Sequence, residues 1–154
     1  MAMTQDTVDL GTGLKLVDGD LVLVADDSQP AQRGFDTISG RPNFAQALQV
    51  IIGTPFGSDP VNVNYGLDVA AIFTTAGTVA SIEDVISLNI VKSLAGDDRV
   101  QQVDNVLFDD SPGFAELAPE LVDSQYRQRR VWHAVASVQL VSGTQQVVVS
   151  GAMP

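Results

Sequence analysis

The chain has 154 residues, of which 45% are hydrophobic, and its 8 Lys and Arg against 19 Asp and Glu leave a net charge of -11. A chain of this size predicts a single domain, residues 1–154, around one hydrophobic core. The negative charge argues against binding to nucleic acid or to an anionic membrane surface, so we expect protein partners.

The composition also argues against membrane spans, disulfides and thiolate metal sites. No apolar stretch approaches the roughly 20 residues that cross a bilayer, and the first residues carry neither the basic nor the apolar region of a signal peptide. The chain contains no cysteine. We therefore expect a soluble, unprocessed protein.

The first element in chain order is a β-hairpin over residues 14–24. Two alternating apolar runs flank Asp18 and Gly19, a dipeptide that favours the positive φ angles of a type I′ turn. Residues 25–42 mix Gly, Pro, Asp and Ser without a period, which predicts a surface loop.

An amphipathic helix is predicted to start at Arg41 and to end at Gly53. Its apolar residues recur at helical spacing, while Gln46 and Gln49 fall on the opposite side. The apolar stripe consists of Phe44, Leu48, Ile51 and Ile52.

The next helical pattern, residues 81–96, is apolar on nearly every side. Ser81 and Asp84 resemble a capping box at its start, and Lys92 and Gly96 suit its end. A helix of this kind needs cover all round, which another protein or this chain's own loops could supply. The apolar positions are Ile82, Val85, Ile86, Leu88, Ile90, Val91 and Leu94.

The last third of the chain predicts a sheet that ends in a hairpin. Residues 100–108 alternate imperfectly, as in a strand, and the acidic residues 109–125, with two prolines, predict an exposed insertion. A long strand from residue 126, a turn at 142–144 and a final strand at 145–150 follow. One face of the long strand carries Ala134, Ala136, Val138 and Leu140.

Together these elements predict a small α+β fold. It has an N-terminal hairpin, two main helices and a mixed or antiparallel sheet that ends in the C-terminal hairpin. The final strand has no proline or lysine to protect its edge, so its free N–H and C=O groups could extend the sheet of another protein. The residues expected to dock in this way are Val147, Val148 and Val149.

No catalytic, metal or cofactor site is predicted. The only histidine, His133, falls within the long strand without a nucleophile or carboxylate at a defined spacing. Glu83 and Asp84 are adjacent on a helix and point about 100° apart, so we interpret them as first-turn charges. We interpret the arginines at residues 127–130 as offsetting the acidic insertion, not as a nucleic-acid site.

Three motifs, in their order and spacing, resemble the phage T4 gene-25-type baseplate wedge family of contractile tails. Members of that family typically show a helix running into a Thr-Pro-x-Gly turn, a Tyr-Gly-Leu-Asp and, after the next helix, an acidic-Pro-Arg-Val step into a strand. The resemblance runs from about residue 14 to residue 106 and resumes in the final hairpin. In this chain the motifs are Thr54-Pro55-Phe56-Gly57, Tyr65-Gly66-Leu67-Asp68 and Asp97-Asp98-Arg99-Val100, with Asp97-Asp98 in place of the usual Glu-Pro.

The resemblance implies a structural subunit of a baseplate, assembled in the bacterial cytoplasm into a virion tail or an injection system. It implies that the subunit joins a helical core bundle with two other wedge proteins and offers its terminal strands to the first ring of tail sheath. Partner contacts are then expected from the motifs and from the apolar helix. The residues concerned are Tyr65, Gly66, Asp97, Arg99, Leu88 and Val91.

Two other function classes stay open at this point. A stand-alone adaptor of the same fold could bind a regulatory protein, because fold does not fix function. A lysozyme-type cell-wall hydrolase would need an acid of raised pKa beside a second carboxylate, and no such pair is indicated. We expect a structural protein and not an enzyme.

Overall fold

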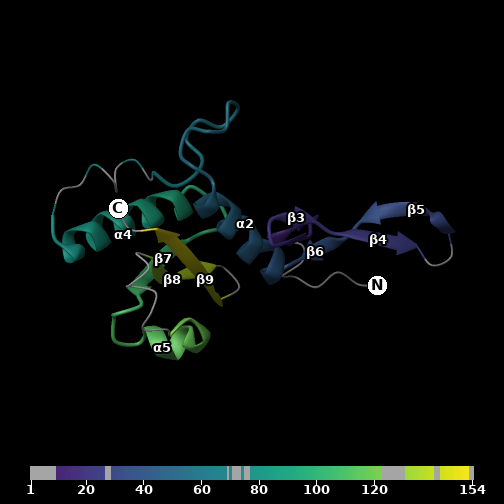
Figure 1. Cartoon of the computed structure of the whole chain (residues 1–154). Helices are drawn as coiled ribbons and strands as arrows, with labels where there is room; N and C mark the ends of the chain where they lie inside the picture. Colours follow the sequence, from purple (N-terminus) through teal and green to yellow (C-terminus); the bar gives the residue numbers. More distant parts are fainter. Residues whose placement is uncertain are drawn as a thin grey trace. The chain divides into compact units, whose positions relative to one another are not determined.

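The computed structural model describes residues 10–26, 29–68, 70, 74, 77–122, 131–140 and 143–152. The predicted α+β class is confirmed (Figure 1). The chain divides into two compact units, residues 1–47 and 48–154, and each is described by itself. No helix in the described part of the chain has the length and apolar character needed to span a bilayer.

The described part of the first unit contains short strands arranged as two-stranded antiparallel sheets. These sheets pair β1 with β6, β2 with β3, and β4 with β5. The φ angles of Asp18 and Gly19 are 52° and 87°, so the predicted type I′ turn between β2 and β3 is confirmed. The strands are β1 Thr12–Leu14, β2 Leu16–Val17, β3 Asp20–Leu21, β4 Leu23–Asp26, β5 Gln29–Phe35 and β6 Thr37–Ser39.

The predicted surface loop at residues 25–42 is wrong, because most of this segment pairs as strands. β5 lies antiparallel to β4 with Leu23 opposite Phe35, and β6 lies antiparallel to β1. Pro30 and Gly34 interrupt any alternation within β5. The pairing is imposed by neighbouring strands that are distant in sequence, which local propensity does not reveal.

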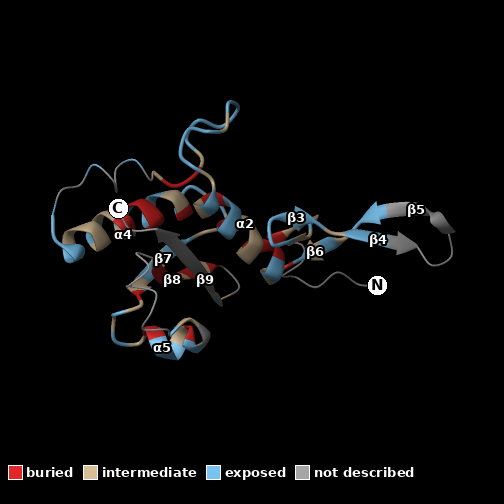
Figure 2. Ribbon diagram, viewed as in Figure 1, coloured by how far each residue is buried: buried red, intermediate tan, exposed pale blue. Residues whose placement is uncertain are grey.

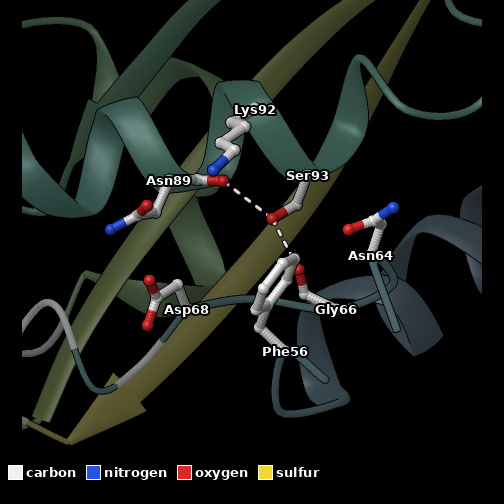
Figure 3. A pocket seen from close by; sticks show the side chains of 7 residues that line it. All are labelled: Phe56, Asn64, Gly66, Asp68, Asn89, Lys92 and Ser93. Carbon is white, nitrogen blue, oxygen red and sulfur yellow. Dashed lines mark hydrogen bonds between the residues drawn. The ribbon is translucent and has the colours of Figure 1, made fainter. Parts of the chain in front are cut away.

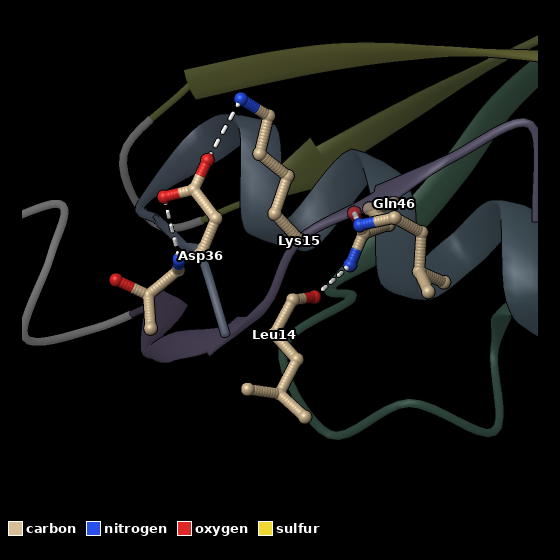
Figure 4. Close-up of polar contacts among 6 residues, drawn as sticks. Leu14, Lys15, Asp36 and Gln46 are labelled. Carbon is tan, nitrogen blue, oxygen red and sulfur yellow. Dashed lines mark hydrogen bonds and ion pairs between the residues drawn. The ribbon is translucent and has the colours of Figure 1, made fainter. Parts of the chain in front are cut away.

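The three sheets meet where three backbone hydrogen bonds form a cycle. Lys15 N donates to Asp36 O at 2.9 Å, Asp36 N donates to Val22 O at 2.8 Å, and Val22 N donates to Lys15 O at 3.1 Å. The Lys15 ammonium also pairs with the Asp36 carboxylate at 3.0 Å (Figure 4). The junction thereby satisfies polar backbone groups that the sheets would otherwise leave open.

Helix α2, Arg41–Gly53, has the predicted bounds, and the predicted apolar residues Phe44, Leu48 and Ile51 are buried. Gln46 was predicted on the side of the helix away from the apolar stripe, but its carboxamide does not simply face solvent. Its Nε2 donates to Leu14 O and its Oε1 accepts from Leu16 N, both at 2.8 Å (Figure 4). The side chain therefore hydrogen-bonds the backbone on both sides of Lys15, where β1 ends and β2 begins.

The second unit is built on a three-stranded antiparallel sheet in which β8 is central, with β7 and β9 on either side. The residues predicted to share one face of β8, Ala134, Ala136, Val138 and Leu140, are all buried, and Val135 on the opposite face is buried as well, so both faces of this strand are covered. β9 is longer than the predicted final strand. The elements are α4 Val79–Leu94, β7 Gln102–Phe108, α5 Phe114–Leu117, the 3₁₀ helix η1 Pro119–Leu121, β8 Val131–Leu140 and β9 Gly143–Ala152.

The predicted start of α4 is wrong by one turn. Thr78 is the N-cap, and its hydroxyl oxygen accepts a hydrogen bond from Ser81 N at 3.3 Å. The Ser81 hydroxyl donates back to Thr78 O at 2.7 Å. Ser81 therefore lies at the third helical position, where it hydrogen-bonds with the N-cap residue and is not itself the N-cap.

Residues 109–122 are not the exposed insertion that their acidity suggests. Phe114 and Ala118 are 1% and 0% exposed and form a cluster with Val135 of β8. Acidic side chains on the same segment, such as Glu116, remain exposed. The segment thus covers the face of the sheet opposite to the one under α4 (Figures 1 and 2). Residues 123–125 lie outside the described residues.

Replacing Phe114 by Ala should lower the free energy of unfolding by about 3–4 kcal/mol, because the aromatic ring is fully enclosed and its loss leaves a cavity. Equilibrium urea denaturation would measure the change. The matched control is Glu116→Ala on the same short helix, which should alter stability by less than about 0.5 kcal/mol. Equal effects from the two variants would mean that α5 does not cover the sheet.

Candidate functional site

The first two motifs of the sequence pair directly with each other in the second unit. Leu67 N donates to Thr54 O at 2.8 Å, and Phe56 N donates to Leu67 O at 2.9 Å, which makes a parallel bridge between Pro55 and Leu67. The intervening residues 57–64 form a loop that this bridge closes at its base. The first two motifs, residues 54–57 and 65–68, are therefore held together by backbone hydrogen bonds.

Gly66 allows the two segments to approach each other. Its φ angle is 106°, in the region that favours glycine, and a Cβ at this position would overlap Thr54 O and the carbonyl carbon of Pro55. The close approach and the backbone conformation both require a residue without a side chain. This accounts physically for the glycine of the Tyr-Gly-Leu-Asp motif.

The paired segments are attached to the last turns of α4. The Ser93 hydroxyl lies 2.9 Å from Gly66 O and 2.8 Å from Asn89 O, and it hydrogen-bonds with these carbonyls (Figure 3). The Lys92 ammonium lies 5.6 Å from the centroid of the Phe56 ring, within the range of a cation–π contact. The helix and the motif turn thus support one another.

A pocket of about 170 Å³ opens between the motif turn and α4 (Figure 3). Its walls combine one cation, one carboxylate, two carboxamides and one aromatic ring. Of the residues that α4 contributes, the sequence indicated only Lys92, as a charge near the helix end, and it predicted no pocket. Asn89 was nevertheless a signal, because it is a polar residue on the buried face between Ile86 and Ile90. The lining residues are Phe56, Asn64, Gly66, Asp68, Asn89, Lys92 and Ser93.

The third motif contains a closely held ion pair. Arg99 Nε donates to Asp97 Oδ1 at 2.8 Å, Arg99 Nη2 donates to Asp97 Oδ2 at 2.6 Å, and Arg99 N also donates to Oδ1 at 3.0 Å. Because the acid is two residues before the arginine, its short side chain reaches both the guanidinium and the backbone. The guanidinium of Arg99 lowers the pKa of Asp97, and the carboxylate in turn raises the pKa of Arg99.

Tyr65 joins the second motif to the third electrostatically. Burial raises the pKa of its phenol, as do the negative charges of Asp97 and Asp59, while the positive charge of Arg99 opposes the increase. Burial and the two carboxylates thus disfavour ionisation of the phenol. Of the residues expected to contact partners, the structure brings together Tyr65, Gly66, Asp97 and Arg99 around the end of α4.

The described residues cover the apolar helix only in part. Ile86, Ile90 and Leu94 are fully buried, whereas Leu88 is 68% exposed and Val91 is 36% exposed. The sequence left open whether this chain or another protein covers the helix, and the chain itself covers the side that carries Ile86, Ile90 and Leu94. In the part of the chain that the structure describes, nothing encloses the side that carries Leu88 and Val91.

The last three expected contact residues lie on β9, in register with β8. Val147, Val148 and Val149 are opposite Ala136, Val135 and Ala134. His133 O and Gln139 O of β8 accept hydrogen bonds from the β7 side. The backbone N–H and C=O groups of the odd-numbered residues of β8 therefore point towards β7, and those of its even-numbered residues point towards β9.

This alternation determines which way the backbone of β9 points. Val147 and Val149 oppose even-numbered residues, so their N–H and C=O groups bond to β8, and those of Val148 point to the outer edge. Among the described residues no strand pairs with that edge. In this part of the structure, the backbone groups of Val147 and Val149 are engaged with β8, and those of Val148 pair with no described strand.

The other residues that the sequence raised as possible reactive groups lie on two different elements. His133 is buried within β8, Glu83 is half-buried on α4, and Asp84 is exposed on it. Within the described ranges, no three His, Asp or Glu side chains gather as a metal site would require. The arginines at 127–130 lie outside the described residues.

Replacing Gly66 by Ala should destabilise the protein by about 2–4 kcal/mol, because the new Cβ meets backbone atoms and the φ angle is unfavourable. Chemical denaturation followed by circular dichroism would measure this loss. Gly53→Ala is the matched control, since a Cβ there meets nothing within 4 Å. The control should be neutral or stabilising by up to about 1 kcal/mol. A Gly66→Ala variant as stable as wild type would disprove the steric constraint.

The contribution of the Asp97–Arg99 pair should depend on pH with a defined sign. Because the folded state lowers the pKa of Asp97 below its ordinary value of 3.8, the pair stabilises the fold above that value, and this stabilisation is lost as pH falls through the lowered pKa. The difference in urea midpoint between wild type and Asp97→Asn should be largest at about pH 6 and should close towards about pH 2.

The control for this titration is Asp98→Asn, which removes the same charge from the exposed neighbour of Asp97. Its effect should stay within about 0.5 kcal/mol at every pH. A difference between wild type and Asp97→Asn that stays constant from acid to neutral pH would rule out the ionised pair as its source.

Comparisons with known proteins add no family assignment to this geometry. A scan of protein-family models finds none that matches the chain, and a search of curated proteins likewise finds no match.

Proposed function

We propose that this protein is a structural baseplate wedge subunit of a contractile tail or injection system. In this role it joins the wedge core bundle and docks the first ring of tail sheath through its C-terminal strands. The observation that carries the proposal is the convergence of the three motifs. The turn at residues 54–57 and the segment at residues 65–68 pair with each other, and the phenol of Tyr65 interacts electrostatically with the Asp97–Arg99 pair of the third motif.

A protein-binding role is supported by apolar surface on both units. Leu88 and Val91 of α4 form an exposed apolar stripe beside the motif cluster, which suits packing against another helix. On the first unit, Leu23 and Phe35 are cross-strand partners and are 56% and 54% exposed. Exposed apolar surface of this kind marks protein interaction sites.

The outer edge of β9 supports docking by strand addition. Its outward backbone groups at Val148, which pair with no strand among the described residues, offer main-chain hydrogen bonds to a fourth strand. Such bonds do not depend on the partner's side chains. A sheath arm in extended conformation is the partner that this edge suits in a contractile machine.

The docking edge can be tested with single substitutions in β9. Val148→Pro removes one outward N–H donor and places the ring on the open edge, where proline is tolerated in an edge strand. Co-purification with the sheath protein of the same system should weaken by about tenfold or more, while circular dichroism stays native. Val148→Thr keeps the donor and the β-branched shape and should bind as wild type does.

Val149→Pro is the control for damage to the fold, because the N–H of Val149 bonds to β8. Its loss should lower the stability of the protein, whereas that of the Val148 N–H should not. Deleting residues 143–154 is less informative, since it strips β8 of a ladder partner. Sheath that binds Val148→Pro as tightly as wild type would refute docking through the outer edge. Loss of binding in Val148→Thr as well would instead assign the contact to the side chain.

A further inference from the structure

The strands β3 and β4 of the first unit present one continuous backbone edge. Only Val22 separates the two strands, and its N–H and C=O groups both bond on the side where β2 and β5 lie. Because backbone groups alternate along a strand, those of Leu21, Leu23 and Ala25 point to the other side. We call these outward groups the β3–β4 edge. Among the described residues, no strand pairs with it.

The side chains along this edge are apolar and uncharged. Residues 21–25 read Leu-Val-Leu-Val-Ala, without proline, and Asp20 and Asp26 flank them. Leu21, Leu23 and Val24 are 45%, 56% and 46% exposed (Figure 2). A short apolar run of high β propensity, exposed on a strand edge, readily pairs with a further strand of the same kind.

The sheet to which the edge belongs is small. β4 pairs with β5 alone, and a two-stranded antiparallel sheet is only marginally stable until a third strand joins it. β5 contains Pro30 and Gly34, two residues that disfavour a further strand on its own outer side. The β3–β4 edge is therefore the side on which this sheet can gain a strand.

The edge is complementary to a second copy of itself. In an antiparallel pair with Leu23 opposite the second copy's Leu23, Leu21 of each copy lies opposite Ala25 of the other. All outward residues then meet outward residues, and each such pair exchanges two backbone hydrogen bonds. On one face, Leu23 of each copy is flanked by its own cross-strand partner Phe35, which is 54% exposed. Four apolar side chains thereby form one row across the joined sheets.

We propose that two copies of this chain associate through the β3–β4 edge, antiparallel and centred on Leu23. The charges along the edge suit this occupant, because the five central residues of both copies carry none. Like charges meet only at the two ends, where Asp20 lies opposite Asp26 of the second copy. The inference does not rest on the baseplate role.

The dimer should be weak and should tighten with salt. Residues 21–25 span only about 14 Å of strand, a short edge beside the about 1,200–2,000 Å² that stable interfaces bury. Each chain carries a net charge of -11, and the end pairs add local repulsion between Asp20 and Asp26. Salt screens this repulsion, whereas it would weaken the binding of a basic partner protein.

The test is sedimentation velocity of the full-length protein from about 10 µM to 1 mM, at about 0.15 M and 0.5 M NaCl. The mean mass should rise from monomer towards dimer with concentration, and the dissociation constant should fall at the higher salt. A protein that stays monomeric in both salts would overturn the proposal. A dimer that weakens with salt would contradict it as well.

Two lysine variants locate the interface. Leu23→Lys places two like charges at the centre of the pair and should raise the dissociation constant about tenfold or more. Val61→Lys is the matched control, since it makes the same charge change in the second unit at a residue that is 93% exposed. It should associate as wild type does. Undiminished association of Leu23→Lys, or an equal loss in Val61→Lys, would refute the assignment to this edge.

A gain of affinity tests the register. Asp20→Lys turns both repulsive end pairs into attractive ones, so it should lower the dissociation constant about fivefold or more. Asp20 is exposed, and circular dichroism should show a native fold. This variant also carries the test if Leu23→Lys does not fold. Association of Asp20→Lys no tighter than that of wild type would contradict the proposed pairing.

Discussion

The close approach of two backbone segments at Gly66 is the constraint on which the rest of the motif surface depends. Because no side chain stands there, Leu67 can pair with the turn after α2, and Gly66 O can reach Ser93 on α4. One position thereby closes the loop at residues 57–64, positions Phe56 under Lys92, and shapes the pocket between them. The absence of a side chain at Gly66 permits the close approach of the two backbone segments on which these features depend.

Helix α4 divides its surface among three tasks, which explains a composition that looks apolar all round. Ile86, Ile90 and Leu94 face the core, Asn89, Lys92 and Ser93 face the pocket, and Leu88 and Val91 remain exposed. Consecutive residues on a helix are about 100° apart, so sixteen residues can serve three directions at once. A helical wheel alone cannot distinguish an apolar face that the chain buries from one that it leaves exposed.

Elements with local signals could be predicted from the sequence, and those held by distant partners could not. The turn at Asp18-Gly19, the bounds of α2 and the residues that share one face of β8 follow from nearby residues alone. The strands within residues 25–42 depend on pairing across the fold. Around α5 a signal did exist, since Phe114 and Ala118 share a helical face, but prolines and acidic residues obscured it. Asp97 and Arg99 were named only through a family resemblance, as partner-contact residues, and neither their pairing nor the pocket can be found without three-dimensional proximity.

The alternation along β9 has a geometric consequence for anything that pairs with its outer edge. Backbone groups of one orientation recur at every second residue, a spacing of about 6.8 Å along an antiparallel strand. A neighbouring strand can therefore slide along this edge only in steps of that length, because a slip of one residue would misalign every donor and acceptor. A strand that pairs with this edge in the wrong register is therefore displaced by a whole number of these two-residue steps.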